Sequence, residues 1–236
     1  METKLIEYQH QGKTFEAHVA MPRGDNQKFP LVFVFHAWGG RDAFACRKAQ
    51  TLAELGYIGA ALDMYGKGVL GANNDENSAL MKPLIEDRVL LRERMLAGVT
   101  ALEKQPFVDR SRLGAIGFCF GGLCALDLAR SGADVKGVVS FHGLLNAPEE
   151  SEKKPIQAKV LVLHGHDDPM VPPKQVANFT CEMTQLNVDW QLHIYGNTMH
   201  AFTNPDANDP KLGTLYQPEA EQRAFQEMEL FLREVF

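Results

Sequence analysis

The sequence predicts an α/β fold with a mostly parallel, doubly wound sheet that starts with two antiparallel strands. Short, continuous apolar runs recur along the chain, which is typical of parallel strands buried on both faces. Segments with the apolar spacing of amphipathic helices separate these runs, so strand and helix alternate. No linker and no internal repeat divides the chain, and we therefore expect one domain over residues 1–236.

The predicted elements begin with a hairpin whose strands cover residues 5–10 and 14–21 and whose turn is Gln11-Gly12. Apolar runs predict buried strands over residues 31–35, 58–62, 113–118, 137–141, 160–163 and 190–195. Helical spacing predicts helices over residues 43–55, 84–102, 122–130, 173–186 and 219–235. In an open sheet of this kind ligands bind beyond the carboxyl ends of the strands, so chemistry is expected in the loops that follow them.

Composition and charge exclude several classes of protein. The chain has 236 residues, of which 45% are hydrophobic and 23% charged, and this balance excludes disordered and fibrous chains. The net charge is −6 and no basic stripe is present, so nucleic acid is not expected as a partner. No apolar stretch reaches the roughly 18 residues of a membrane span and no secretion signal is evident, so we expect a cytoplasmic protein without a membrane partner.

A nucleophile elbow is the strongest chemical signal in the sequence. Residues 117–122 read Gly-Phe-Cys-Phe-Gly-Gly, which places Cys119 in the pattern Gly-x-nucleophile-x-Gly between a strand and a helix. Gly117 and Gly121 fit this turn because a Cβ two positions from the nucleophile would clash. The helix N-terminus beside the sulfur favours the thiolate. No serine has these flanks, so Cys119 is the predicted nucleophile; the alternative is a buried structural cysteine.

A base and an orienting carboxylate follow the elbow in the order nucleophile, acid, histidine. Asp168 comes after the strand over 160–163 and precedes a Pro-x-Val-Pro turn, which favours it over Asp167 as the acid. His200 lies in the loop after the strand over 190–195. We therefore predict a catalytic triad of Cys119, Asp168 and His200.

The oxyanion hole is predicted to use two backbone N–H groups. One belongs to Phe120, the residue after the nucleophile, and the other to Trp38 in the loop His-Ala-Trp-Gly-Gly over residues 36–40. We interpret His36 as a strand-end residue that is hydrogen-bonded to backbone. Asp63 and Tyr65, at another strand end, are expected to shape their loop rather than to react.

Taken together, these motifs resemble the dienelactone hydrolase family, whose members are cysteine hydrolases on an α/β-hydrolase fold. The resemblance rests on residues 36–40, 63–66, 117–122, 164–172 and 200–202. It implies the α/β-hydrolase fold and the triad roles already assigned to Cys119, Asp168 and His200. Founding members of the family carry a glutamate where this chain has Ala37, and an arginine close after the triad histidine, where residues 203–205 read Thr-Asn-Pro. Lys82 lies near the place of another arginine, and we interpret it as a solvated surface lysine.

The predicted function is hydrolysis of a small ester or lactone through a thioester intermediate, without a cofactor. Aromatic side chains are predicted to form the substrate pocket, and the candidates are Trp38, Phe118, Phe120 and Phe202. The partner is a small-molecule substrate, and the oligomeric state is left open between monomer and homodimer.

Two alternatives compete with this interpretation. His164, His166 and Asp168 have the His-x-His-x-Asp spacing of zinc hydrolases, although the histidine expected next is replaced by Pro169. The other alternative is a non-catalytic binding protein on the same fold, which would leave the intact triad pattern without a purpose. Metal analysis would discriminate the zinc enzyme from the cysteine enzyme.

Overall fold

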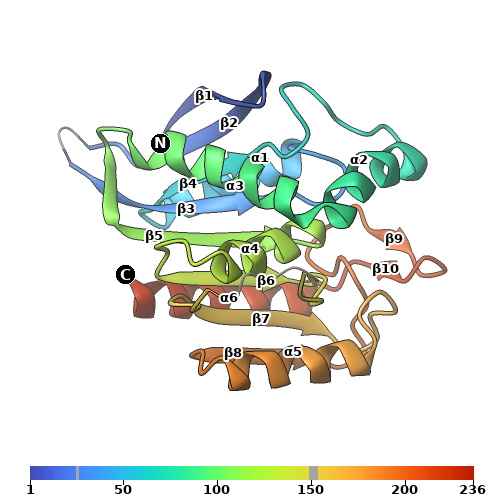
Figure 1. The fold of residues 1–236 in the computed structure, drawn as a ribbon. Helices are drawn as coiled ribbons and strands as arrows, with labels where there is room; N and C mark the ends of the chain where they lie inside the picture. The colour runs from blue at the N-terminus through green and yellow to red at the C-terminus, as the bar shows by residue number, and fades with distance from the viewer. Residues whose placement is uncertain (25–26, 149–153) are drawn as a thin grey trace. The chain divides into compact units, whose positions relative to one another are not determined.

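The computed structural model describes residues 1–24, 27–148 and 154–236. Its contacts divide the chain into two compact units, an N-terminal unit over residues 1–116 and a C-terminal unit over residues 117–236 (Figure 1). Strand β5 (Val108–Phe118) begins in the first unit and ends in the second. The prediction of a single domain stays a prediction.

The N-terminal unit contains the antiparallel start that the sequence predicts. Strands β1 (Glu2–His10) and β2 (Lys13–Met21) form a hairpin, and β2 pairs antiparallel with β4 (Ile58–Leu62). Strand β4 pairs parallel with β3 (Phe29–Phe35), so the four strands follow the order β1-β2-β4-β3. Every residue of β4 is buried, which explains its unbroken apolar run.

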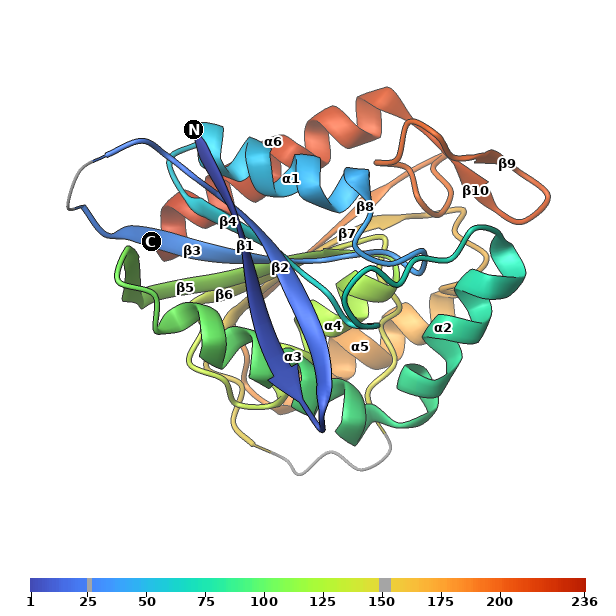
Figure 2. The same cartoon turned by 90° about the horizontal axis from the view of Figure 1, so that it is seen from above.

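Helices cover both sides of these strands. Helix α1 (Ala43–Glu54) lies on one side and α3 (Arg88–Glu103) on the other (Figure 2). The Asp42 side chain accepts a hydrogen bond from the Ala45 N–H at 3.0 Å and so begins α1. Helix α1 packs so closely on β4 that a Cβ at Gly59 would lie 2.1 Å from the carbonyl oxygen of Ala49.

The single helix predicted over residues 84–102 is wrong, because the chain forms two helices there. Helix α2 (Asn74–Glu86) ends before Asp87, whose φ of −116° and ψ of 86° are not helical. The Asp87 side chain accepts from the Leu90 N–H at 2.9 Å and caps the N-terminus of α3. Its backbone N–H donates to the Pro83 carbonyl and closes the last turn of α2. The helical spacing of apolar residues therefore continues before and after Asp87, but the aspartate cap ends one helix and begins the next.

The C-terminal unit has the predicted parallel strands with helices on both faces. Strands β6 (Gly137–Phe141), β7 (Lys159–Gly165) and β8 (Trp190–Tyr195) are paired in parallel. The prediction that the strand over 190–195 is buried is wrong, because β8 lies at the edge of the sheet and none of its residues is fully buried. Helices α4 (Phe120–Arg130) and α5 (Pro173–Gln185) lie on one side, and α6 (Pro218–Val235) lies on the other (Figures 1 and 2). A small hairpin of β9 (Asn208–Asp209) and β10 (Thr214–Leu215), which the sequence did not predict, precedes α6.

The core of the C-terminal unit is rich in phenylalanine. The rings of Phe118 and Phe141 stack with their centroids 4.8 Å apart, and Phe225 packs 5.1 Å from Phe141. Every residue of α4 is buried, including Cys124, which therefore belongs to the core. Among the helices in the part of the chain that the structure describes, none is long and apolar enough to cross a membrane.

The close approach of α1 and β4 predicts a specific cost for a methyl group at Gly59. Gly59→Ala should lower the free energy of unfolding by roughly 1–3 kcal/mol, because the Ala49 backbone must move to admit the Cβ. Gly196→Ala is the matched control, since a Cβ at Gly196 meets nothing within 4 Å, and it should be neutral or stabilising by up to about 1 kcal/mol. Urea unfolding of both variants measures the difference, and equal stabilities would contradict the packing argument.

Candidate active site

Cys119 occupies a strained turn between β5 and α4. Its φ of 55° and ψ of −117° are rare for a residue with a side chain, and its backbone N–H donates to the Phe141 carbonyl at 3.1 Å. A Cβ at Gly117 would lie 1.9 Å from the carbonyl oxygen of Gly121, so only glycine fits there. The turn is therefore of the kind that the Gly-x-Cys-x-Gly pattern predicts, with the half-buried Cys119 directly before the first residue of α4.

A second close contact fixes the beginning of α4 against the end of β6. A Cβ at Gly122 would lie 2.6 Å from the Ser140 Oγ and 2.7 Å from the Gly143 Cα. The Gly122 N–H donates to the Cys119 carbonyl at 2.9 Å, which closes the first turn of the helix. The direction of the helix at the cysteine is thus set by backbone packing on β6.

His200 and Asp168 form a buried hydrogen-bonded pair. The His200 Nδ1 lies 2.7 Å from the Asp168 Oδ2, and both residues are at most 3% exposed. The second carboxylate oxygen of Asp168 accepts from the Met170 N–H at 2.8 Å. Because a carboxylate only accepts, the His200 Nδ1 carries a proton. Asp167 is exposed, so the structure brings Asp168 and not its neighbour to the histidine.

The charge around His200 favours its protonated form. Burial opposes a positive ring, but the negative charge of Cys119 and the hydrogen bond to Asp168 outweigh it and raise the pKa of His200 to about 10. The three side chains that the sequence analysis named as a triad therefore interact, and all of them belong to the C-terminal unit.

Residues 213–215, to which the sequence analysis assigned no role, hold the backbone of His200. Its N–H donates to the Gly213 carbonyl at 3.0 Å, and its carbonyl accepts from the Leu215 N–H at 3.1 Å. Gly213 has a φ of +86°, and a Cβ there would lie 2.1 Å from the Pro169 Cγ. This segment therefore fastens the histidine loop beside the residue that follows Asp168. The isolated Gly213 was the one local signal that could have pointed to it.

The residues of the zinc alternative do not converge. His164 is buried and His166 is exposed. Burial lowers the pKa of His164, which favours its neutral form, against the opposite influence of Asp168. Among the residues that the structure describes, no group of three or more His, Cys, Asp or Glu side chains is arranged to hold a metal ion.

In the N-terminal unit, His36 bonds to backbone at both ring nitrogens. Its Nδ1 lies 2.6 Å from the Ala37 carbonyl oxygen, and its Nε2 accepts from the Met64 N–H at 3.1 Å. The ring therefore carries its proton on Nδ1, and burial lowers its pKa, so it stays neutral. The interpretation of His36 as a backbone-bonded residue is confirmed.

The expected loop roles of Asp63 and Tyr65 are also confirmed. One Asp63 carboxylate oxygen accepts from the Tyr65 N–H at 2.8 Å and from the Gly66 N–H at 2.9 Å. The Tyr65 hydroxyl donates to the Trp38 carbonyl at 2.9 Å, so it holds the loop over residues 36–40. Lys82 is a surface lysine as interpreted, with an exposed side chain 3.7 Å from Glu86.

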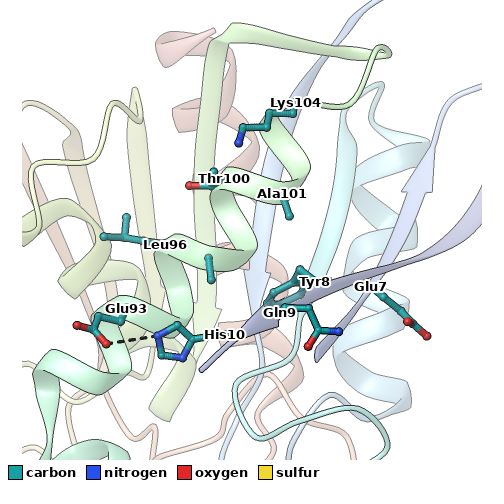
Figure 3. Close-up of a pocket in the computed structure, with 10 residues that line it drawn as sticks. Glu7, Tyr8, Gln9, His10, Glu93, Leu96, Thr100, Ala101 and Lys104 are labelled. Carbon is teal, nitrogen blue, oxygen red and sulfur yellow. Dashed lines mark ion pairs between the residues drawn. The ribbon is translucent and has the colours of Figure 1, made fainter. Parts of the chain in front are cut away.

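Pockets occur in both units. One of about 590 Å³ lies between β1 and α3 (Figure 3), where the His10 ring pairs with Glu93 at 3.3 Å. Another of about 440 Å³ lies beside residues 145–147 and the beginning of α5. Neither is lined by a predicted triad or pocket residue. Phe118, Phe120 and Phe202 are fully buried. Their role in lining a substrate pocket stays a prediction.

Comparison with known proteins identifies relatives of the whole chain. The profile of the dienelactone hydrolase family matches residues 15–236. The solved structure of m3DLH is 37% identical, with a TM-score of 0.94 over 100% of this chain and 98% of that one. A dienelactone hydrolase-like promiscuous phosphotriesterase from metagenomic libraries is 34% identical, with a TM-score of 0.92 over the same shares. A Bradyrhizobium protein named "Probable 2-oxo-3-(5-oxofuran-2-ylidene)propanoate lactonase" is 30% identical over 87% of this chain and 84% of its own length. The predicted α/β-hydrolase fold is thereby confirmed.

The pKa of His200 can be tested directly. The ring should carry both protons at pH 7 and lose one only near pH 10, because the charge of Cys119 and the bond to Asp168 favour the cation. In Cys119→Ala one of these two influences is absent, so the pKa of His200 should fall. Nitrogen-15 NMR titration of the histidine rings measures both values. A neutral His200 at pH 7 in the parent, or an unchanged pKa in the variant, would contradict the assignment.

Proposed function

The chain belongs to the dienelactone hydrolase family and is an ester or lactone hydrolase, and we propose that it acts through a thioester on Cys119. The observation that carries the proposal is the buried hydrogen bond between His200 and Asp168, beside a cysteine at a strained strand-to-helix turn. A nucleophile, a base and an orienting acid are the three groups that acyl transfer needs. Their interaction within one compact unit supports this reaction.

In the first step the thiolate of Cys119 attacks the acyl carbon of the ester or lactone. A bond forms between sulfur and carbon, and the carbonyl electrons move to the oxygen. The N–H groups of Phe120 and Trp38 are the proposed donors to this oxyanion. When the carbon–oxygen bond breaks, the Nε2 of His200 gives its proton to the departing oxygen. In a lactone the departing alcohol stays attached to the acyl group.

In the second step water cleaves the thioester. The neutral His200 takes a proton from water as the oxygen attacks the thioester carbon, and the carbon–sulfur bond then breaks. The products are the carboxylic acid and the Cys119 thiolate beside a protonated His200, so the starting charge pair is restored. Asp168 keeps the Nδ1 proton in place throughout, which leaves Nε2 as the atom that exchanges protons.

The proposed substrates are small esters or lactones that need no free carboxylate. This chain has Ala37 where founding members of the family carry a glutamate, and residues 203–205 supply no arginine to hold an anionic substrate. Trp38, Phe118 and Phe202, predicted for the pocket, would favour an apolar or aromatic acyl group. A panel of short-chain aryl esters and enol lactones, each with and without a carboxylate, tests this.

Cytoplasmic location and the absence of a cofactor also remain part of the proposal.

The nucleophile can be identified by alkylation. Iodoacetamide should label Cys119 faster than Cys181, although Cys119 is half-buried and Cys181 is exposed. The reason is that His200 and the helix N-terminus favour the thiolate form of Cys119. Hydrolysis should fall in step with labelling of Cys119. Peptide mass spectrometry at timed intervals follows both thiols, and Cys181→Ser serves as the control with unchanged activity.

Two outcomes would overturn this assignment. Cys119 could be fully alkylated while hydrolysis continues, or the inactivation could follow the labelling of another cysteine. Either result would move the nucleophile elsewhere in the chain.

The adjacent aspartates provide a matched pair for the orienting acid. Asp168→Asn should lower kcat by a factor on the order of 10⁴, because an amide can hold the wrong imidazole tautomer. Asp167→Asn should change kcat little, since Asp167 is exposed and the His200 ring contacts its neighbour. Steady-state kinetics on one aryl ester compares the variants. The reverse ranking would contradict the role of Asp168.

A further inference from the structure

A second histidine contacts the proposed base and has no step in the reaction. His142 follows β6 directly, and its ring centroid lies 5.2 Å from that of His200 at an interplanar angle of 66°. Both residues are nearly inaccessible, with 2% and 1% of their surface exposed. The two rings therefore pack edge to face inside the C-terminal unit, where the packing of one limits the motion of the other.

The backbone at His142 has a conformation that residues other than glycine rarely adopt. Its φ is +38°, and its N–H donates to the Leu163 carbonyl of β7 at 2.8 Å. Such strain persists only where the surroundings over-determine the conformation, and it is concentrated at functional sites. The strand end thus directs this imidazole inward, toward the loop that carries His200.

A buried hydroxyl fixes the rotation of the His142 ring. The Thr203 Oγ1 lies 2.8 Å from the His142 Nε2, and Thr203 has no exposed surface. Removing either partner would leave a buried polar group without this hydrogen bond. Thr203 stands three residues after His200, so one loop supplies both the proposed base and the hydroxyl that orients its neighbour.

The His142 ring also packs on Phe202, with centroids 5.2 Å apart and an interplanar angle of 78°. Phe202 in turn packs on Tyr195 of β8 at 5.6 Å. Because Phe202 packs against it and Thr203 bonds its Nε2, the His142 ring has a defined plane. It is therefore a rigid surface against which a neighbouring ring can rest.

The His200 ring needs such a surface. Its bond to Asp168 restrains the ring at Nδ1 alone, and a hydrogen bond can bend, so some rotation about the Cβ–Cγ bond of the histidine is still allowed. That rotation would carry Nε2 away from the sulfur of Cys119. We propose that His142, oriented by Thr203, is a positioning residue that holds the plane of the His200 ring during proton transfer. This proposal rests on the proposed function, since it concerns the base of that reaction.

Two substitutions test the proposal with matched controls. Thr203→Val removes the hydroxyl at nearly constant volume, and His142→Ala removes the ring. Both should lower kcat by roughly 10- to 100-fold and leave KM within about twofold, because a displaced base slows chemistry more than binding. Thr203→Ser keeps a hydroxyl and should retain parent activity. Thr180→Val on α5, whose hydroxyl bonds only its own helix at Ala177, should do the same.

A spectroscopic readout separates positioning from general destabilisation. The proton between His200 Nδ1 and Asp168 should give a low-field proton NMR signal. In Thr203→Val and His142→Ala this signal should move or exchange faster with water, at a temperature where both variants are folded. In Thr203→Ser and Thr180→Val it should stay in place.

Three results would overturn the proposal: unchanged kcat in both test variants, a rise in KM at constant kcat, or a reduced kcat with an unchanged low-field signal. The second result would make the ring a substrate contact instead. Cys119→Ala in the same assay keeps the two proposals apart. Its survival as an active enzyme would overturn the proposed function, whereas an inactive Cys119→Ala with fully active His142 variants would overturn only the positioning role.

Discussion

The contact between Gly117 and Gly121 is the constraint on which the rest of the site depends. A Cβ at Gly117 would lie 1.9 Å from the Gly121 carbonyl oxygen. Because glycine has no Cβ, the chain can reverse from β5 into α4 within a few residues. That reversal forces Cys119 into its strained φ and ψ and leaves its sulfur at the beginning of the helix. Because α4 is buried along its whole length, core packing supplies the free energy that offsets this strain.

Electrostatics then determines how the partners of Cys119 are arranged. A half-buried thiolate and a buried imidazolium are each costly alone, but their opposite charges attract, and Asp168 adds one further negative charge. That charge is distributed, since the Asp168 carboxylate accepts hydrogen bonds from both His200 and the Met170 N–H. The N-terminal end of α4 contributes partial positive charge beside the sulfur. The raised pKa of His200 is the consequence of this balance, in which attraction exceeds the cost of burial.

The sequence predicts those features that neighbouring residues determine. The bounds of β4, β6 and β8 agree with their apolar runs, and the elbow turn agrees with its glycines, because both depend on a few adjacent side chains. The sequence did not reveal His142, which is 61 residues from its partner Thr203, or the backbone bonds between His200 and Gly213. Those contacts arise from tertiary packing, and no local period or spacing encodes them. The break at Asp87 was missed for the opposite reason, since a local cap overruled a regular apolar period.

In the loop over residues 36–40, two consecutive carbonyls are held by side chains of the N-terminal unit. His36 donates to the Ala37 carbonyl, and Tyr65 donates to the Trp38 carbonyl. A trans peptide is planar, so fixing a carbonyl also fixes the direction of the N–H on the opposite side of the same bond. The N–H groups of Trp38 and of the following glycine are thereby given defined directions. A protonated His36 would place an N–H against the Met64 N–H that its Nε2 now accepts, so the bond between this ring and the Met64 backbone exists only while the histidine is neutral. Burial, which lowers the pKa of His36, is what keeps it neutral.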